Sequence, residues 1–97
     1  MPRELMDVFK EVYTILAEYE KLFLAKGYKS PFTAYLDYQT WRIIQQYIQS
    51  NRIGSMGNSE GIMLIRYQNW KIFGQAELKN EIIMHPGERV HRQLSRE

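Results

Sequence analysis

The residues best suited to hold a metal ion lie near the C-terminal end of the chain. His85 and His91 are the two histidines, and Glu81 and Glu88 stand close to them in sequence. A zinc site needs ligands that converge at a defined spacing, often with cysteines among them, and the chain has no cysteine. Two histidines on either side of the Pro86-Gly87 turn do not have that spacing. We therefore expect no metal site and no cofactor.

The chain has no residue that we assign to nucleophilic or acid–base catalysis. Without cysteine there is no thiolate chemistry, and we assign no serine or threonine to the role of nucleophile. The carboxylates fall mainly on the polar side of the first helical segment, in connecting segments and in the tail, where solvation accounts for them. We predict that the protein is not an enzyme and has no small-molecule substrate.

The segment Ile53-Gly54-Ser55-Met56-Gly57 is similar to the I-G-x-x-G core of KH domains, in which two glycines let the backbone approach RNA phosphates. In KH domains this loop joins two helices and usually carries a basic residue between the glycines. Here Ser55 and Met56 fill that position, and Gly61 opens a strand-like segment. We interpret residues 51–60 as a loop and as the best candidate for a mobile segment.

Arginines and tyrosines support an alternative function, the binding of nucleic acid. Tyrosine and tryptophan rings can stack on bases, and arginines can contact phosphates. Composition gives this alternative little support, because 13 basic and 11 acidic residues leave a formal net charge of only +2. Most of the aromatic residues also fit core positions. The residues that would form such a surface are Arg42, Arg52, Arg66, Arg89 and Arg92.

The 97-residue chain is expected to fold as a single domain over residues 1–88, followed by a charged tail over residues 89–97. Arg3, Glu4 and Asp7 interrupt the place where a signal peptide needs an apolar core. No apolar run reaches the roughly 18 residues of a membrane span. We therefore expect a soluble cytoplasmic protein with no membrane partner, and the absence of cysteine fits that reducing compartment.

The first helical segment, residues 2–26, has more apolar surface than one packing face needs. Apolar residues recur at alternating steps of four and three from Leu5 to Phe23, and Lys26-Gly27 ends the pattern. On a helical wheel the apolar positions cover roughly 220°, against little more than 100° for one packing face. Either the domain buries this helix on two sides, or one flank packs on a second chain. We favour the second interpretation and assign the contact to four flank residues: Met6, Tyr13, Ala17 and Leu24.

The rest of the pattern predicts a second helix and a small sheet. Residues 28–37 favour a short strand at a sheet edge, although a helix starting at Ser30-Pro31 is the alternative. Asp37 is a good N-cap for a helix over residues 38–50. Three strands follow, and the turn Gln68-Asn69 separates the first two: Ile62–Tyr67, Trp70–Phe73 and Glu81–His85. Because Ile62 to Ile65 are all apolar, the first of these is expected to be central and covered on both faces.

One part of the sequence resembles small phage-encoded proteins built from a helix followed by a β-meander. The resemblance covers residues 35–41, a glycine-containing loop, and residues 64–88. Tyr67 before the turn, Ile72, Leu78 and the pair Glu81-Ile82 match that pattern. The resemblance implies a phage or mobile-element origin, with a place in the host cytoplasm or the virion, and a structural or accessory role.

These observations predict an α+β fold, with two helices packed on a mainly antiparallel sheet of three to four strands. The function we predict is that of a non-enzymatic interaction module that self-associates, its partner being a second copy or another protein.

Overall fold

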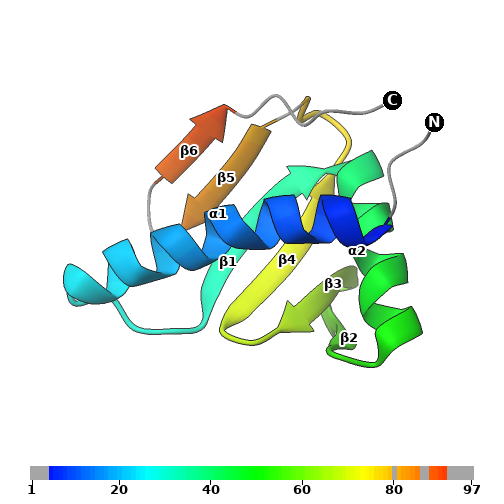
Figure 1. The fold of residues 1–97 in the computed structure, drawn as a ribbon, viewed down its shortest axis with the longest axis horizontal. Helices are drawn as coiled ribbons and strands as arrows, with labels where there is room; N and C mark the ends of the chain where they lie inside the picture. The colour runs from blue at the N-terminus through cyan, green and yellow to red at the C-terminus, as the bar shows by residue number, and fades with distance from the viewer. Residues whose placement is uncertain (1–4, 80, 86–87, 92–97) are drawn as a thin grey trace.

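The computed structural model describes residues 5–79, 81–85 and 88–91, the last of these by their backbone alone. Within these residues two helices pack on a six-stranded sheet, and α1 crosses the front of the sheet in Figure 1. This confirms the predicted α+β class. In chain order the elements are α1 (Leu5–Ala25), β1 (Phe32–Asp37), α2 (Tyr38–Asn51), β2 (Ser55–Ser59), β3 (Ile62–Tyr67), β4 (Trp70–Gln75), β5 (Glu81–His85) and β6 (Glu88–His91).

The strands follow one another across the sheet in the order β2-β3-β4-β1-β5-β6. The pair β1–β4 is parallel and the other neighbouring pairs are antiparallel, as predicted for a mainly antiparallel sheet. The position of β1 differs from the expectation, because it lies inside the sheet and not at an edge. Pro31 precedes the first ladder residue, Phe32, so its missing N–H does not interrupt the pairing.

Two segments form strands where the sequence pattern suggests a loop and a tail. Residues 51–60 contain β2, and residues 89–91 belong to β6, while residues 92–97 lie outside the described part. Apart from Met56, which packs against the core, the residues of β2 are glycine or small and polar. The backbone of all five residues pairs with β3, and this pairing makes the segment a strand. Strand β3 is interior as predicted, but it is not fully covered, since Ile62 is 57% and Met63 53% exposed.

Helix α1 ends where the sequence predicts. Gly27 has a φ of +91°, the left-handed conformation that favours glycine at this position. The Tyr28 N–H donates to the Phe23 carbonyl at 3.0 Å, which closes the last turn. The buried side of α1 consists of Val8, Phe9, Val12, Ile15, Leu16 and Phe23. It includes most of the apolar face expected from the helical pattern, but Leu5 and Tyr19 of that pattern are only half-buried, and Leu22 beside them is 41% exposed.

Helix α2 begins at the predicted cap. The Asp37 carboxylate accepts a hydrogen bond from the Thr40 N–H at 3.1 Å, and Asp37 itself has extended backbone angles. Arg52, with a φ of +55°, ends the helix in the left-handed conformation. The buried side of α2 includes Trp41, Ile44 and Ile48, so one strong cap and one apolar stripe account for this element.

Replacing Asp37 with alanine is expected to reduce the free energy of unfolding by about 1 kcal/mol, within a range of roughly 0.5–2 kcal/mol. The reason is that the Thr40 N–H would lose its acceptor at a buried position. Chemical denaturation followed by circular dichroism measures the change. Asp37→Asn keeps a capping oxygen and serves as the control. Equal loss in both variants would show that the cap is not the cause.

One core fills the space between the helices and the sheet. Its strand residues lie on a single face of the sheet, and they are Phe32, Ala34, Leu36, Ile65, Trp70, Ile72, Ile82 and Met84. At one end Glu20 of α1 accepts hydrogen bonds from the Trp70 indole N–H at 3.2 Å and from Asn69 Nδ2 at 2.8 Å. Asn69 belongs to the predicted turn, so this carboxylate fastens α1 to the β3–β4 hairpin.

Candidate functional site on the open face of the sheet

The two faces of the sheet differ in what covers them. In the described residues α1 and α2 both pack on the face that carries Trp70 and Ile72. The opposite face, which we call the open face, has no helix on it in this part of the chain. Because side chains alternate along a strand and paired residues share a face, the ladder register identifies its members. On β1, β3, β4 and β5 they include Thr33, Tyr35, Ile62, Leu64, Arg66, Lys71, Phe73, Gln75, Glu81, Ile83 and His85. Ser55, Gly57 and Ser59 of β2 lie on the same face.

A central apolar row runs across the open face, perpendicular to the strands. Tyr35 of β1 stands between Phe73 of β4 and Ile83 of β5 in the ladder register. The rings of Tyr35 and Phe73 are stacked, with centroids 5.3 Å apart and an angle of 24° between their planes. Leu64 of β3 continues the row beside Phe73. Tyr35, Phe73 and Ile83 are half-buried, whereas Leu64 is fully buried.

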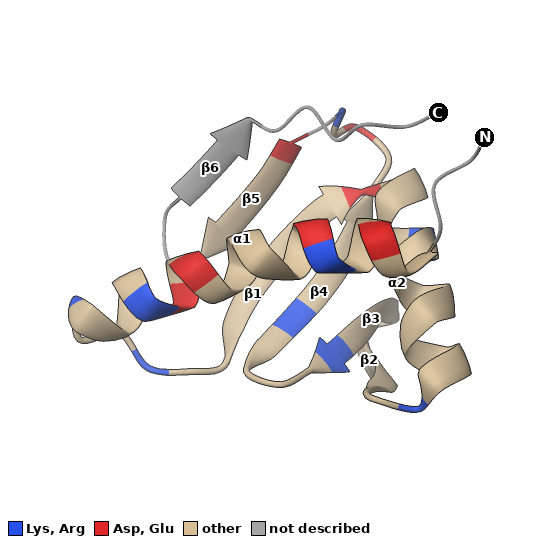
Figure 2. Ribbon diagram, in the orientation of Figure 1, with Lys and Arg blue, Asp and Glu red and all other residues tan. Residues whose placement is uncertain are grey.

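Groups of opposite charge flank the central row on its two sides. On one side Arg66 pairs with Lys71 in the β3–β4 ladder, and His85 of β5 lies at the same end of the strands. On the other side lies Glu81, at the start of β5. Figure 2 shows this separation, with a basic residue near the start of β4 and an acidic one at the start of β5, at opposite ends of the sheet. The open face is therefore basic along one margin and acidic along the other.

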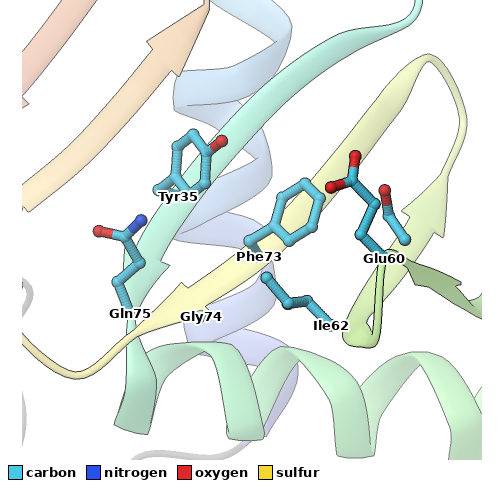
Figure 3. A pocket seen from close by; sticks show the side chains of 7 residues that line it. Tyr35, Glu60, Ile62, Phe73, Gly74 and Gln75 are labelled. Atoms are coloured by element: carbon cyan, nitrogen blue, oxygen red, sulfur yellow. The ribbon is translucent and has the colours of Figure 1, made fainter.

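A pocket of about 370 Å³ lies on the acidic side of the row, at the β2–β3 turn. In Figure 3 the Phe73 side chain lies between Tyr35 and Glu60, and Ile62 lies below Phe73. The lining residues are Tyr35, Ser59, Glu60, Ile62, Phe73, Gly74 and Gln75.

The turn that carries Glu60 has a fixed shape. Glu60 and Gly61 both have positive φ angles, +53° and +83°, as a two-residue hairpin turn requires. The Asn58 side-chain oxygen accepts a hydrogen bond from the Gly61 N–H at 3.0 Å and closes the turn. The one charged side chain that lines the pocket is the Glu60 carboxylate, and the rings of Phe73 and Tyr35 line it as well. Such a pocket suits a cation.

The predicted contact on the flank of α1 is divided in the structure. Met6 is 43% and Leu24 51% exposed, but 18 positions separate them, roughly 27 Å along a helix. Between them Ala17 is half-buried, and Tyr13 packs against the core. The Tyr13 ring stacks on Phe9 at 5.9 Å and meets Tyr67 edge-on at 5.2 Å. The four residues therefore do not form one continuous exposed patch.

The environment of Tyr13 also changes the pKa of its hydroxyl group. Burial raises the pKa of the Tyr13 hydroxyl above its ordinary value, and Tyr67 and Glu20 add to the effect. All three causes disfavour the tyrosinate. Tyr13 is thus held as a neutral ring within the domain's own aromatic cluster.

The arginines proposed for nucleic acid do not gather on one surface. Arg42 is exposed on α2, where its guanidinium lies 5.9 Å above the Tyr38 ring, and Arg52 ends the same helix. Arg66 lies on the open face. The backbone of Arg89 pairs with Ile83 in β6, and Arg92 lies outside the described residues.

The KH-like glycines have a packing explanation. A side-chain carbon added at Gly54 would lie 2.7 Å from the Arg66 carbonyl oxygen, and one at Gly57 would lie 2.7 Å from Arg66 Nε. Gly54 therefore lets the segment before β2 approach the β3 backbone closely, and Gly57 leaves room for the Arg66 side chain. The segment leads into a hairpin and does not join two helices, so the KH resemblance is absent from the fold.

One motif match escaped the sequence interpretation. Residues Gly57 to Gly61 read Gly-Asn-Ser-Glu-Gly and fit the G-x-S-x-G pattern of a nucleophile elbow. In such an elbow the serine sits on a turn between a strand and a helix. Ser59 instead ends β2 at a hairpin turn, so the match does not indicate a hydrolase. Among the described residues no group of three or more histidine, aspartate or glutamate side chains is arranged to hold a metal ion.

Comparison of the chain with family models, with curated proteins and with solved structures finds no match in any of the three. None of the helices in the described residues has the length and apolar character needed to cross a membrane.

Proposed function

We propose that the protein is a non-enzymatic interaction module that associates with itself through the open face of its sheet. The observation that carries this proposal is that Phe73, Tyr35 and Ile83 of the central row are only half-buried, on a face that no helix covers in the described part of the chain. Covering an apolar row of this kind with a second apolar surface removes it from water. A second copy offers such a surface.

Two sheets pack face to face at a separation of about 10 Å, with their strands within about 30° of parallel or antiparallel. Most homodimers have a two-fold axis. If that axis runs along the central row, each apolar residue faces the same row of the other copy. The margin of one copy that carries Arg66 and Lys71 then lies over the margin of the other copy that carries Glu60 and Glu81. A two-fold axis along the strands would place like charges together, so charge favours the first arrangement.

The mass in solution tests the proposal. Light scattering over micromolar concentrations is expected to show a dimer of the natural chain. Phe73→Asp places a carboxylate in the centre of the contact and is expected to weaken association by about a hundredfold or more, because that charge would be buried without a partner. Leu24→Asp is the matched control, since it adds the same charge on the exposed flank of α1. It should leave the dimer intact.

Circular dichroism shows whether each variant is folded, and so separates a loss of association from a loss of structure. Should Phe73→Asp fail to fold, Tyr35→Asp tests the same row. A natural chain that stays monomeric, or a folded Phe73→Asp variant that dimerises as well as the natural chain, would end the proposal. Loss of the dimer in Leu24→Asp alone would return the contact to the flank of α1.

A second candidate function is the binding of single-stranded nucleic acid on the same face. It is favoured by the pair Arg66 and Lys71, which stand beside the stacked rings of Tyr35 and Phe73. It requires binding that weakens steeply with salt. Fluorescence anisotropy with labelled oligonucleotides at low salt decides it, and no change in anisotropy would remove this candidate.

The resemblance to small phage-encoded proteins is part of the proposal as far as role is concerned. A self-associating module without catalytic residues fits a structural or accessory role. We place it in the cytoplasm, because a chain without cysteine has no disulfide bond that reducing conditions could break.

A further inference from the structure

We infer that the pocket at the β2–β3 turn receives the Lys71 side chain of a second copy of the chain, with Glu60 as its charge partner. This inference rests on the proposed function, because it names the contact that orients one copy on the other. It explains why a pocket lined by aromatic and acidic groups lies at the acidic margin of the open face.

The ladder register determines what lies over the pocket. On β4, Lys71 stands two residues before Phe73 of the central row, and Gln75 stands two residues after it. A two-fold axis along the row exchanges these two sides. Lys71 of one copy therefore lies over Gln75 of the other, and Gln75 lines the pocket. By the same rule Arg66 on β3 lies over Ile62, which also lines the pocket.

The twist between the sheets does not remove this correspondence. Two residues span about 7 Å along a strand, and a rotation of about 30° moves a point at that distance by about 3.5 Å. The flexible four-carbon stem of lysine can absorb a shift of this size. His85, two residues beyond Ile83, would at the same time lie over Glu81, two residues before it. All three correspondences bring a basic group over an acidic or pocket-lining one.

The chemistry of the pocket matches an ammonium group. The rings of Tyr35 and Phe73 stack on each other. An aromatic ring attracts a cation to a face that is not covered in this way. The Glu60 carboxylate, the Ser59 hydroxyl and the Gln75 side-chain oxygen can each accept one of its three hydrogen bonds. Among the residues that line the pocket no side chain carries a positive charge. A lysine from the other copy would meet attraction there and no repulsion.

Charge reversal in the two positions tests the inference. Glu60→Lys sets two lysines against each other in the homodimer, and Lys71→Glu sets two carboxylates against each other. Each variant alone is expected to self-associate about tenfold more weakly, or worse, than the natural chain. A mixture of the two variants restores both contacts, because lysine at position 60 then meets glutamate at position 71 and the reverse. We expect the mixed dimer to form with an affinity close to that of the natural one.

Two matched controls carry the same changes of charge outside the pocket. Glu77→Lys and Lys79→Glu alter exposed residues in the link between β4 and β5 and should leave association unchanged. Light scattering and native mass spectrometry of the single and mixed samples measure the result.

The outcomes separate this inference from the proposal on which it rests. Unchanged association in both single variants, or no recovery on mixing, overturns the pocket contact. If Phe73→Asp abolishes the dimer in the same series, the open face remains the interface with a different orientation. A monomeric natural chain overturns both.

Discussion

Replacing Trp70 with alanine is expected to lower the free energy of unfolding by about 3–5 kcal/mol. The side chain is 1% exposed and belongs to an aromatic cluster in which its ring lies 5.5 Å from Phe32 and 6.4 Å from Phe23. Alanine leaves a cavity there. It also removes the indole N–H that donates to Glu20. Because domains of this size have total stabilities of about 5–15 kcal/mol, a large share of the variant should be unfolded under mild conditions.

Urea denaturation followed by circular dichroism measures this loss. Trp70→Phe keeps most of the ring volume and gives up the hydrogen bond, so it should lose markedly less stability than the alanine variant. Glu20→Gln keeps an acceptor for the indole and reports on the charge alone. A loss below about 1 kcal/mol in Trp70→Ala would show that the cluster repacks, against our description of the core.

The second large effect is expected at Gly74, where α2 crosses β4. A side-chain carbon added there would lie 2.9 Å from Trp41 Cγ and 3.0 Å from Trp41 Cβ and Cδ2. The Trp41 indole cannot easily move aside, because its N–H donates to the Ile72 carbonyl at 2.8 Å and the side chain is 4% exposed. Gly74→Val should therefore cost at least about 1–3 kcal/mol through overpacking.

The matched control for this prediction is Gly61→Asn. Gly61 has a φ of +83° and no atom within 4 Å of an added side-chain carbon, and asparagine tolerates this backbone conformation better than most residues. The midpoint of thermal unfolding should fall far less in Gly61→Asn than in Gly74→Val. Equal shifts in the two variants would contradict the contact with Trp41 as the cause of the cost at Gly74, because Gly74, unlike Gly61, does not have a positive φ.

The open face shows why sequence reasoning located some elements and missed the surface. On β1 the residues Thr33 and Tyr35 alternate with Phe32 and Ala34, and both sets contain an aromatic ring. Alternation identifies the strand, but because both faces carry an aromatic ring it does not indicate which face the helices cover. The helical pattern instead indicates a contact on the flank of α1, because apolar residues cover so much of that helix. Tyr13, on that flank, packs against Phe9 and Tyr67 of its own chain.

The two strands absent from the predictions have a shared cause. Strand β2 is built from Ser55, Met56, Gly57, Asn58 and Ser59, which is the composition of a loop. Its pairing depends on the backbone groups offered by β3, a property of the neighbour and not of the segment. Residues 88–91 likewise became a strand through pairing with β5. The side-chain pattern of a segment does not indicate whether a neighbouring strand has backbone groups available for pairing.

The sequence by itself determined the features that depend on neighbours a few residues away: the two helices, the Asp37 cap, the Gly27 end of α1, the turn at Gln68-Asn69 and the alternation of the strands that follow. Only the tertiary structure decided which strands lie side by side, and so which residues share the open face. The parallel pairing of β1 with β4 brings Tyr35 to Phe73, although α2, β2 and β3 separate the two strands in the sequence. This pairing assembles the central row. Helix caps and turns form from hydrogen bonds within a few residues, whereas strand pairing joins segments whose distance in the sequence leaves no local signal.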